Sequence, residues 1–146
     1  YKVDELYGYI MKILGLDRQW NAIIIGAGKL GSALALYQGF ADRGFNIKAV
    51  LDINPQIIGA RLDGIEVEAL GKLAERVKEQ AINIGVITVP ASVAQEVTDQ
   101  LIQAGVKAIL NFSPRILKVP QDVVLRNVDL SVNLEVLSFN LALNHR

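Results

Sequence analysis

The sequence predicts an α/β fold with a doubly wound parallel sheet. Short apolar segments of β-forming residues alternate with helix-forming segments along most of the 146 residues, which is typical of βαβ crossovers. Residues 22–25 lead directly into a glycine-rich turn and a helix-forming segment. Residues 84–89 are continuously apolar apart from one glycine and one threonine, as expected for a central strand buried on both faces. A chain of this length builds one core, so we expect a single domain of the Rossmann type.

The glycine-rich turn has the spacing of a dinucleotide-binding motif. Residues 23–31 read I-I-I-G-A-G-K-L-G, which places G-x-G-x-x-G directly after a strand and before a helix. In this motif the first glycine makes a tight turn, the second lets the backbone approach a pyrophosphate, and the third lets the helix pack on the sheet. Free amides at the start of the helix then face the phosphates. The plainer alternative is a glycine turn that holds no ligand. The predicted phosphate site consists of Gly26, Ala27, Gly28, Lys29, Leu30 and Gly31.

The next strand ends in a candidate ribose-binding acid. After a helix to about Arg43 and a turn at Gly44, residues 46–52 predict a strand whose last residue is Asp52. An acid at this position accepts hydrogen bonds from the adenosine ribose hydroxyls. Its negative charge repels a 2′-phosphate, which favours NAD over NADP. The alternative is that Asp52 only caps the strand end.

The middle of the chain predicts a short strand and a helix. Residues 59–64 have the composition of a loop, and residues 65–67 that of a short strand. Residues 70–80 predict an amphipathic helix. Its inward-facing residues are expected to be Leu73, Ala74 and Val77.

A second helix is expected after the central apolar run. Pro90 ends that run, and Ser92 is expected to cap a helix that extends to about residue 103. Gly105 is expected to close it.

The segment after this helix predicts two more strands. One covers residues 106–110 and is followed by a loop at residues 111–114. Residues 119–120 and 123–125 indicate further strand before a turn at residues 127–129.

Ligands of doubly wound sheets bind beyond the carboxyl ends of the strands, where the strand order reverses. Val89 and Pro90 lie at such an end and offer apolar contact and a rigid turn, although a simple strand terminator explains them nearly as well. The ligand contacts predicted in addition to the glycine turn and Asp52 are Ile53, Val89, Pro90, Asn111, Phe112, Ser113 and Pro114.

The two ends of the chain predict helices that a minimal Rossmann domain does not need. Apolar residues recur at helical spacing from Val3 to Leu14, and Gly15 is expected to end that helix. Residues 130–144 predict a helix with large apolar residues around most of its circumference, which is typical of burial on several sides. We therefore expect this helix to be exchanged with a second subunit, and the alternative is that it lies on its own sheet.

Composition disfavours several other functions. The 15 basic residues balance 15 acidic ones, whereas a chain that grips DNA by itself is usually basic. The absence of cysteine excludes disulfides, thiolate catalysis and cysteine-ligated metal sites. The single histidine, His145, is a weak candidate for acid–base catalysis, and no metal site is expected. We find no signal peptide and no apolar run long enough to span a bilayer, and expect a cytoplasmic protein.

Several longer segments carry a resemblance to a known family. They include G-A-G-K-L-G-S-A-L followed by Tyr37, L-D-I-N-P from residue 51, T-V-P-A from residue 88, and I-L-N-F-S-P from residue 109. The resemblance extends from Y-K-V at the first residue to N-V-D-L from residue 127 and L-S-F from residue 137. With these segments the chain resembles the Rex family of redox-sensing transcriptional repressors over essentially all of its length.

The resemblance implies a homodimeric repressor that binds NAD(H), prefers NADH, and leaves its operator DNA when NADH binds. Residues 1–15 would connect to a winged-helix domain absent from this sequence, residues 16–128 would be the NAD(H)-binding domain, and residues 129–146 the dimerisation helix. Tyr37 and Asp129 match a tyrosine and an aspartate that meet across the dimer in the redox switch. Phe112, Ser113 and Pro114 would lie near the nicotinamide half of the cofactor.

Two enzyme functions remain as alternatives. A CoA-binding Rossmann domain of a succinyl-CoA synthetase-like enzyme shares the first strand and the glycine turn. A small dehydrogenase is weakened by the lack of a substrate domain and of a suitably placed histidine.

Overall fold

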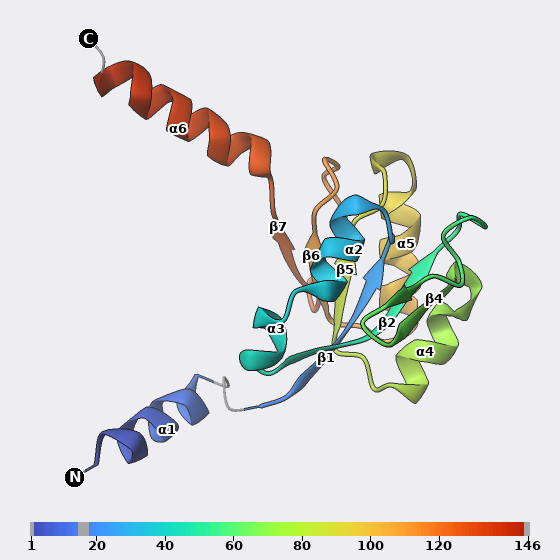
Figure 1. Ribbon diagram of the computed structural model, residues 1–146, viewed down its shortest axis with the longest axis horizontal. Helices are drawn as coiled ribbons and strands as arrows, with labels where there is room; N and C mark the ends of the chain where they lie inside the picture. The colour runs from blue at the N-terminus through green and yellow to red at the C-terminus, as the bar shows by residue number, and fades with distance from the viewer. Residues whose placement is uncertain (1, 15–17, 145–146) are drawn as a thin grey trace.

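A computed structural model describes residues 2–14 and 18–144 of the chain. Within these residues, one sheet of seven strands has the order β3-β4-β2-β1-β5-β6-β7 (Figure 1). All neighbouring strands are parallel except β3 and β4. The strands are β1 (Trp20–Ile25), β2 (Phe45–Asp52), β3 (Arg61–Leu62), β4 (Ile65–Ala69), β5 (Ile84–Ile87), β6 (Ala108–Asn111) and β7 (Val124–Asn127).

The six parallel strands, numbered along the chain without β3, follow the spatial order 3-2-1-4-5-6. This is the order of the doubly wound dinucleotide-binding fold, and its direction reverses between β1 and β5. The predicted fold class is therefore confirmed. The helices are α1 (Val3–Ile13), α2 (Lys29–Leu36), α3 (Gly39–Asp42), η1 (a 3-10 helix, Leu70–Lys72), α4 (Leu73–Glu79), α5 (Ala91–Gln103) and α6 (Leu130–Asn144).

The sheet separates two apolar cores, because successive residues of a strand point to opposite faces. On one face Ile23 and Ile25 of β1 pack with residues of α4 and α5 such as Val77 and Leu101. On the other face Ile24 packs with residues that include Ala35 of α2. All three isoleucines are essentially inaccessible to solvent. The glycine turn that follows β1 therefore starts from the most rigid part of the fold.

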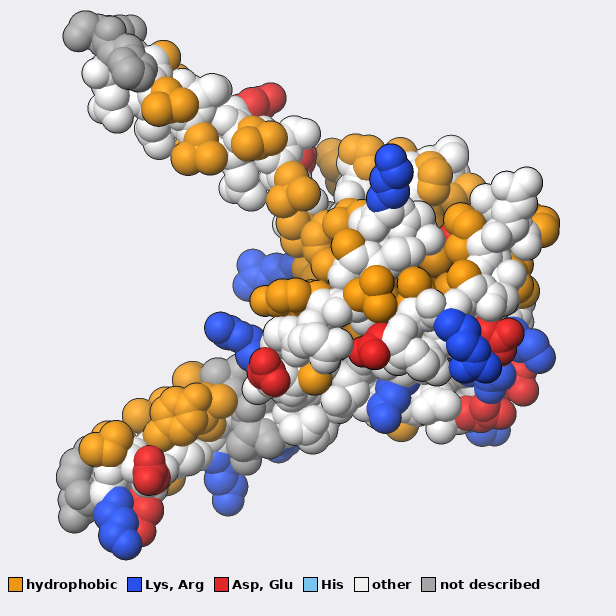
Figure 2. Space-filling view, viewed as in Figure 1, with side chains coloured by type: hydrophobic (Ala, Val, Ile, Leu, Met, Phe, Trp, Pro, Cys, Tyr) orange, Lys and Arg blue, Asp and Glu red, His pale blue; other side chains and the backbone are white. Residues whose placement is uncertain are grey.

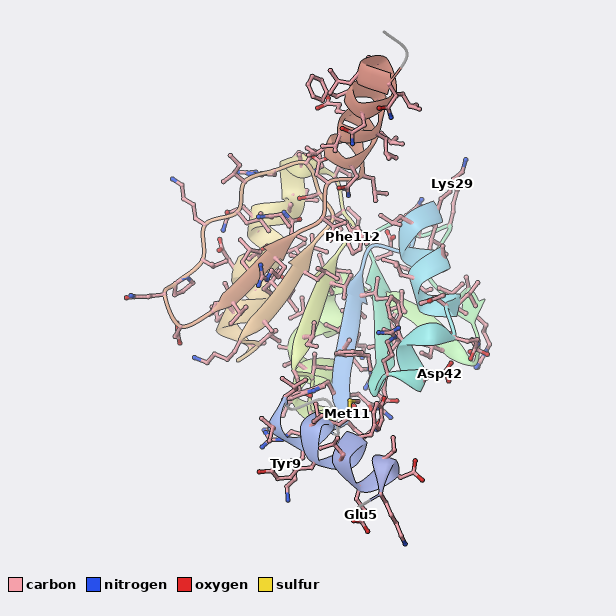
Figure 3. The ribbon with its side chains drawn as sticks, turned by 90° about the vertical axis from the view of Figure 1, so that its left-hand side faces the viewer. Glu5, Tyr9, Met11, Lys29, Asp42 and Phe112 are labelled. Atoms are coloured by element: carbon pink, nitrogen blue, oxygen red, sulfur yellow. The ribbon has the colours of Figure 1, made fainter. Side chains whose placement is uncertain are left out.

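The face of the sheet that carries α2 and α3 is only partly covered. The connection from β6 to β7, residues 112–123, contains no helix that could cover this side of β6 and β7. Val124 on β7 is 63% exposed. An apolar groove of about 290 Å³ opens over β1, β2, β5 and β6 beside α2 and α3, and Figure 3 looks onto this side of the sheet. The groove is lined by Ala22, Ile24, Leu34, Phe40, Arg43, Phe45, Ile47, Ile84, Val86, Leu110 and Phe112.

The two terminal helices project from the body of the domain. Figure 1 shows α1 and α6 extending from opposite ends of the same side, and Figure 2 shows apolar side chains along both. Neither helix has a buried residue. The expected burial of the last helix on several sides is thus absent within one chain. The large apolar side chains that α6 exposes are Leu130, Val132, Leu134, Val136, Leu137, Phe139, Leu141 and Leu143.

The predicted helix to Arg43 is wrong, because α2 ends at Leu36 and the short α3 follows. Tyr37 has an extended backbone with ψ 116°. Its ring contacts Phe40 edge to face, with the ring centroids 4.8 Å apart. A Cβ on Gly39 would lie 2.4 Å from the tyrosine ring. This aromatic contact, which helical periodicity cannot indicate, accompanies the interruption of the helix.

Three smaller expectations also fail. The loop at residues 59–64 contains β3, which pairs antiparallel with β4 through a turn at Asp63 and Gly64, both with positive φ. Ala74 is exposed rather than inward-facing. Ser92 does not cap α5, because that helix already starts at Ala91 and Pro90, with its fixed φ, takes the N-cap position.

Candidate functional site

The glycine turn brings β1 and α2 into close backbone contact. Gly26 has φ +106°, a conformation that favours glycine, and its amide donates to the carbonyl of Leu51 at 2.8 Å. A Cβ on Gly31 would lie 1.8 Å from the carbonyl oxygen of Gly26, so no side chain fits there. Gly28 differs, because a Cβ at that position would have no neighbouring atom within 4 Å. Its backbone therefore borders open space at the start of α2, where unpaired amides favour an anion.

Asp52, at the end of β2, holds the glycine turn. One of its carboxylate oxygens accepts a hydrogen bond from the amide of Ala27 at 2.7 Å, and the other accepts from the amide of Asn54 at 2.9 Å. The capping role that the sequence left open is thus present. Each carboxylate oxygen can accept a further hydrogen bond, so capping and ribose binding are compatible.

A cleft of about 430 Å³ lies between the glycine turn, the end of β2 and the first turns of α5. Six of its lining residues were not predicted, and the spacing of three of them, at 93, 96 and 97, could have indicated one face of α5. Thr88 belongs to the T-V-P-A segment, but nothing in the sequence indicated its structural role. Its hydroxyl donates to the carbonyls of Ile25 and Gly26, at 3.0 and 2.8 Å. The lining residues are Ile25, Gly26, Gly28, Asp52, Ile53, Leu70, Thr88, Val89, Pro90, Val93, Glu96 and Val97.

A second, smaller pocket of about 190 Å³ lies on the other side of the glycine turn. One wall is Leu30 at the start of α2 together with the loop after β6, and the other wall is the segment that leads into α6. The strand order reverses between β1 and β5, whose ends both border the first cleft, and an elongated ligand that crosses the glycine turn from there would reach the second pocket. The lining residues are Leu30, Phe112, Ser113, Pro114, Val128, Asp129, Leu130 and Ser131.

Four predicted contact residues lie outside both cavities, and one of them is Gly31, which packs against the carbonyl of Gly26. Ala27 is buried and donates its amide to Asp52. Lys29 is exposed, and Figure 3 shows its side chain pointing away from the domain and from Phe112. Asn111 is fully buried beneath the second pocket. Side chains outside the cavities can still shape the site, because Ala27 and Asn111 make hydrogen bonds that position the loops around it.

Tyr37 and Asp129 are not brought together within one chain. Asp129 lines the second pocket with Leu30, the second residue of α2, whereas Tyr37 follows the last residue of that helix. Tyr37 is 60% exposed. A carboxylate oxygen of Asp129 accepts hydrogen bonds from the amides of Ser131 and Val132, at 2.9 and 3.3 Å, and so caps the start of α6. Their predicted meeting across a dimer stays a prediction.

An ion pair with two hydrogen bonds joins β4 to α4. Arg76 of α4 and Glu68 of β4 form two parallel hydrogen bonds, both 2.7 Å long. These bonds from the guanidinium hold the pKa of Glu68 below its ordinary value. Leu70, which lines the cleft, lies between the two residues in the chain. The ion pair therefore holds together β4 and α4, the two elements on either side of Leu70, and neither of its residues lines the cleft.

Other kinds of site find little support. The described residues contain no cluster of three or more His, Cys, Asp or Glu that could hold a metal ion. In the same part of the chain, no helix has the length and apolar character needed to cross a membrane. Gly15 and His145 lie outside the described residues.

Comparisons with known proteins find relatives along the whole chain. Residues 17–115 match the family model of the CoA binding domain. A redox-sensing transcriptional repressor Rex of Syntrophomonas wolfei is 69% identical over all 146 residues, which cover 70% of its length. The corresponding repressor of Desulfitobacterium hafniense is 51% identical over 141 residues, which are 97% of this chain and 67% of that protein.

Solved structures of RSP, a Rex-family repressor, superimpose on the chain with a TM-score of 0.91 and 45% identity. One contains β-NADH, and another contains β-NAD⁺ and operator DNA. The aligned region covers 99% of this chain, and 70% and 67% of the RSP chain in the two complexes.

Proposed function

Because the chain belongs to the Rex family of redox-sensing transcriptional repressors, and residues 17–115 to the CoA binding domain family, we propose that it is the NAD(H)-binding regulatory part of such a repressor. NADH binding would release the repressor from operator DNA. The observation that carries the proposal is the pair of cavities on either side of the glycine turn in a fold that matches NADH-bound RSP.

The cofactor would span the two cavities. The pyrophosphate would lie against Gly28 and the start of α2, and the adenosine would occupy the larger cleft beside Asp52. The nicotinamide would occupy the smaller pocket beside Phe112 and Ser113. Oxidised nicotinamide is cationic and reduced nicotinamide is neutral, so the pocket can favour one state over the other. Only such a difference in affinity can shift a two-state repressor.

The first cleft also argues for NAD(H) rather than CoA. The adenosine of CoA carries a 3′-phosphate and that of NADP a 2′-phosphate, whereas both ribose hydroxyls of the NAD adenosine are free. The residues that line this cleft include two acids, Asp52 and Glu96, and no lysine or arginine. An additional phosphate would therefore meet negative charge without a cation to pair with it.

We propose that α6 is exchanged between two copies of the chain. Its eight exposed apolar residues run around the helix, and a helix apolar on all sides is stable in water only when it is covered. The apolar groove over β1, β5 and β6 offers such cover on a second copy. Tyr37 and Asp129 of different copies would meet in that dimer.

The contacts to DNA would come from the part of the longer repressors that this chain does not span. RSP and the curated relatives are longer than the chain, which covers about 70% of them. A winged-helix domain joined to α1 would supply these contacts and cover the apolar face of α1. A repressor of this kind works by binding rather than by catalysis, and would act in the cytoplasm.

The cofactor site can be tested residue by residue in solution. Addition of NADH is expected to shift the amide NMR signals of Gly26, Gly28 and Ser113. The signals of Gly8 on α1 and of Gly105, which follows the end of α5, serve as controls, because neither residue adjoins a residue that lines either cavity. Shifts confined to the controls, or no shifts at all, would contradict the proposed site.

A further inference from the structure

Asn111, the last residue of β6, is a polar side chain in a fully buried position. Burying an amide without partners costs free energy, yet all four hydrogen-bonding positions of this side chain are used. Its Nδ2 donates to the carbonyl of Arg115 at 3.0 Å and to Oδ1 of Asn127 at 2.9 Å. Its Oδ1 accepts from the amide and the hydroxyl of Ser113, at 2.9 and 2.6 Å.

These four hydrogen bonds reach both walls of the second pocket. Ser113 and Arg115 belong to the loop that forms one wall, and Asn127 ends the strand that leads into α6. The backbone carbonyl of Asn111 also accepts from the amide of Val128, at 2.9 Å, on the α6 side. The loop and the residues that lead into α6, here called the root of α6 (residues 127–129), therefore hydrogen-bond to the same buried residue.

We propose that Asn111 is a positioning residue that couples the ligand-binding loop at residues 112–115 to the root of α6. The inference rests on the proposed function, because the ligand that displaces the loop is taken to be NADH. A displaced loop that leaves Asn111 in place breaks the hydrogen bonds of a buried amide, so moving the loop and the amide together is favoured. The amide then moves Asn127 and Val128, and with them the start of α6.

The coupling can be broken at Asn127 without disturbing the pocket. Asn127 is exposed, so in the Asn127→Ala variant water can replace the lost oxygen, and folding should be preserved. Asn127→Asp keeps an oxygen that can accept from Asn111 and serves as the matched control. Neither substitution touches the residues that line the two cavities.

The test measures hydrogen exchange of the amides at residues 128–134, with and without NADH, beside the Kd of NADH for each variant. In the unmodified chain and in Asn127→Asp, NADH is expected to slow this exchange about fivefold, the factor that corresponds to one net hydrogen bond. In Asn127→Ala the Kd should stay the same while most of the slowing disappears. A purely structural role of Asn127 would lower stability without changing the response to NADH.

Two results would overturn the inference separately from the proposed function. If NADH binds but does not slow hydrogen exchange at residues 128–134, Asn111 does not couple the loop to α6. The same conclusion follows if NADH slows this exchange equally in Asn127→Ala and in the unmodified chain. If NADH does not bind the unmodified chain, the proposed function fails, and the coupling fails with it.

Discussion

The carboxylate of Asp52 and the amide of Ala27 are joined by a hydrogen bond of 2.7 Å, although 25 residues separate them in the chain. The bond ties the end of β2 to the glycine turn after β1. Asp52 consequently has two parts to play at this site, because it shapes the turn that would hold the pyrophosphate and it faces the cleft that would hold the ribose.

Replacement of Asp52 by asparagine should therefore change ligand selectivity. The asparagine side chain would keep one accepting oxygen but lose the negative charge that repels an additional phosphate. We expect NADH to bind about tenfold more weakly and the preference for NADH over NADPH to narrow. Glu66→Gln, which removes a carboxylate from an exposed residue of β4, is the matched control. Equal weakening of NADH and NADPH would show that Asp52 acts only as a cap.

Gly28 and Gly31 should respond differently to alanine. A Cβ on Gly28 meets no atom and its φ of −70° suits alanine, so Gly28→Ala should fold normally. The added methyl group would occupy the space of the pyrophosphate and weaken NADH binding at least about tenfold. Gly71→Ala, also free of contacts, should bind NADH like the unmodified chain. Unchanged NADH binding in Gly28→Ala would contradict the assigned phosphate site.

Gly31→Ala is expected to lower the stability of the fold rather than to block the ligand. Its Cβ would lie 1.8 Å from a backbone oxygen, so α2 must move away from the sheet. We expect a loss of stability of about 1–3 kcal/mol or more, the cost of an overpacked core. Chemical denaturation measures it, and a midpoint equal to that of the unmodified chain would mean that α2 packs less closely than described.

The glycine turn could be predicted because its signal is local: a strand, three glycines and a helix within a dozen residues. The extent of α6 was also predicted, since apolar residues and the turn at Asp129 bound it. The roles of Thr88 and Asn111 could not be predicted, because their partners lie on other strands and only the folded sheet brings them together. The break after Leu36 could not be predicted either, because the side-chain contact that accompanies it is not encoded in the periodicity.

The exposed surface of α6 predicts that dimer formation depends on it. Phe139 is 65% exposed in the single chain, and burying an aspartate at its position would cost several kcal/mol. We expect Phe139→Asp to shift the chain toward a monomer in light scattering, whereas Asn140→Asp should form the same dimer as the unmodified chain. If Phe139→Asp is still dimeric, α6 is not the dimer contact.

The ion pair between Glu68 and Arg76 predicts a stability that depends on pH. The pKa of Glu68 is lowered in the folded state, so its contribution is complete above its unfolded value, about 4.3. The contribution is lost as the pH falls through the lowered pKa. The unmodified chain should therefore be more stable than Glu68→Gln at pH 7, and the difference in stability should shrink as the pH falls below about 4.3. A difference that stays constant as the pH falls would rule out this ion pair as its source.

The central claim is that this chain distinguishes NADH from related ligands at the site around the glycine turn. Calorimetric titration of the chain with NADH, NAD⁺ and CoA, each separately under the same conditions, tests it most directly. We predict that NADH binds much more tightly than NAD⁺, and that CoA binds weakly or not at all because of Asp52 and Glu96. Tight binding of CoA alone, or no binding of either dinucleotide, would contradict the account.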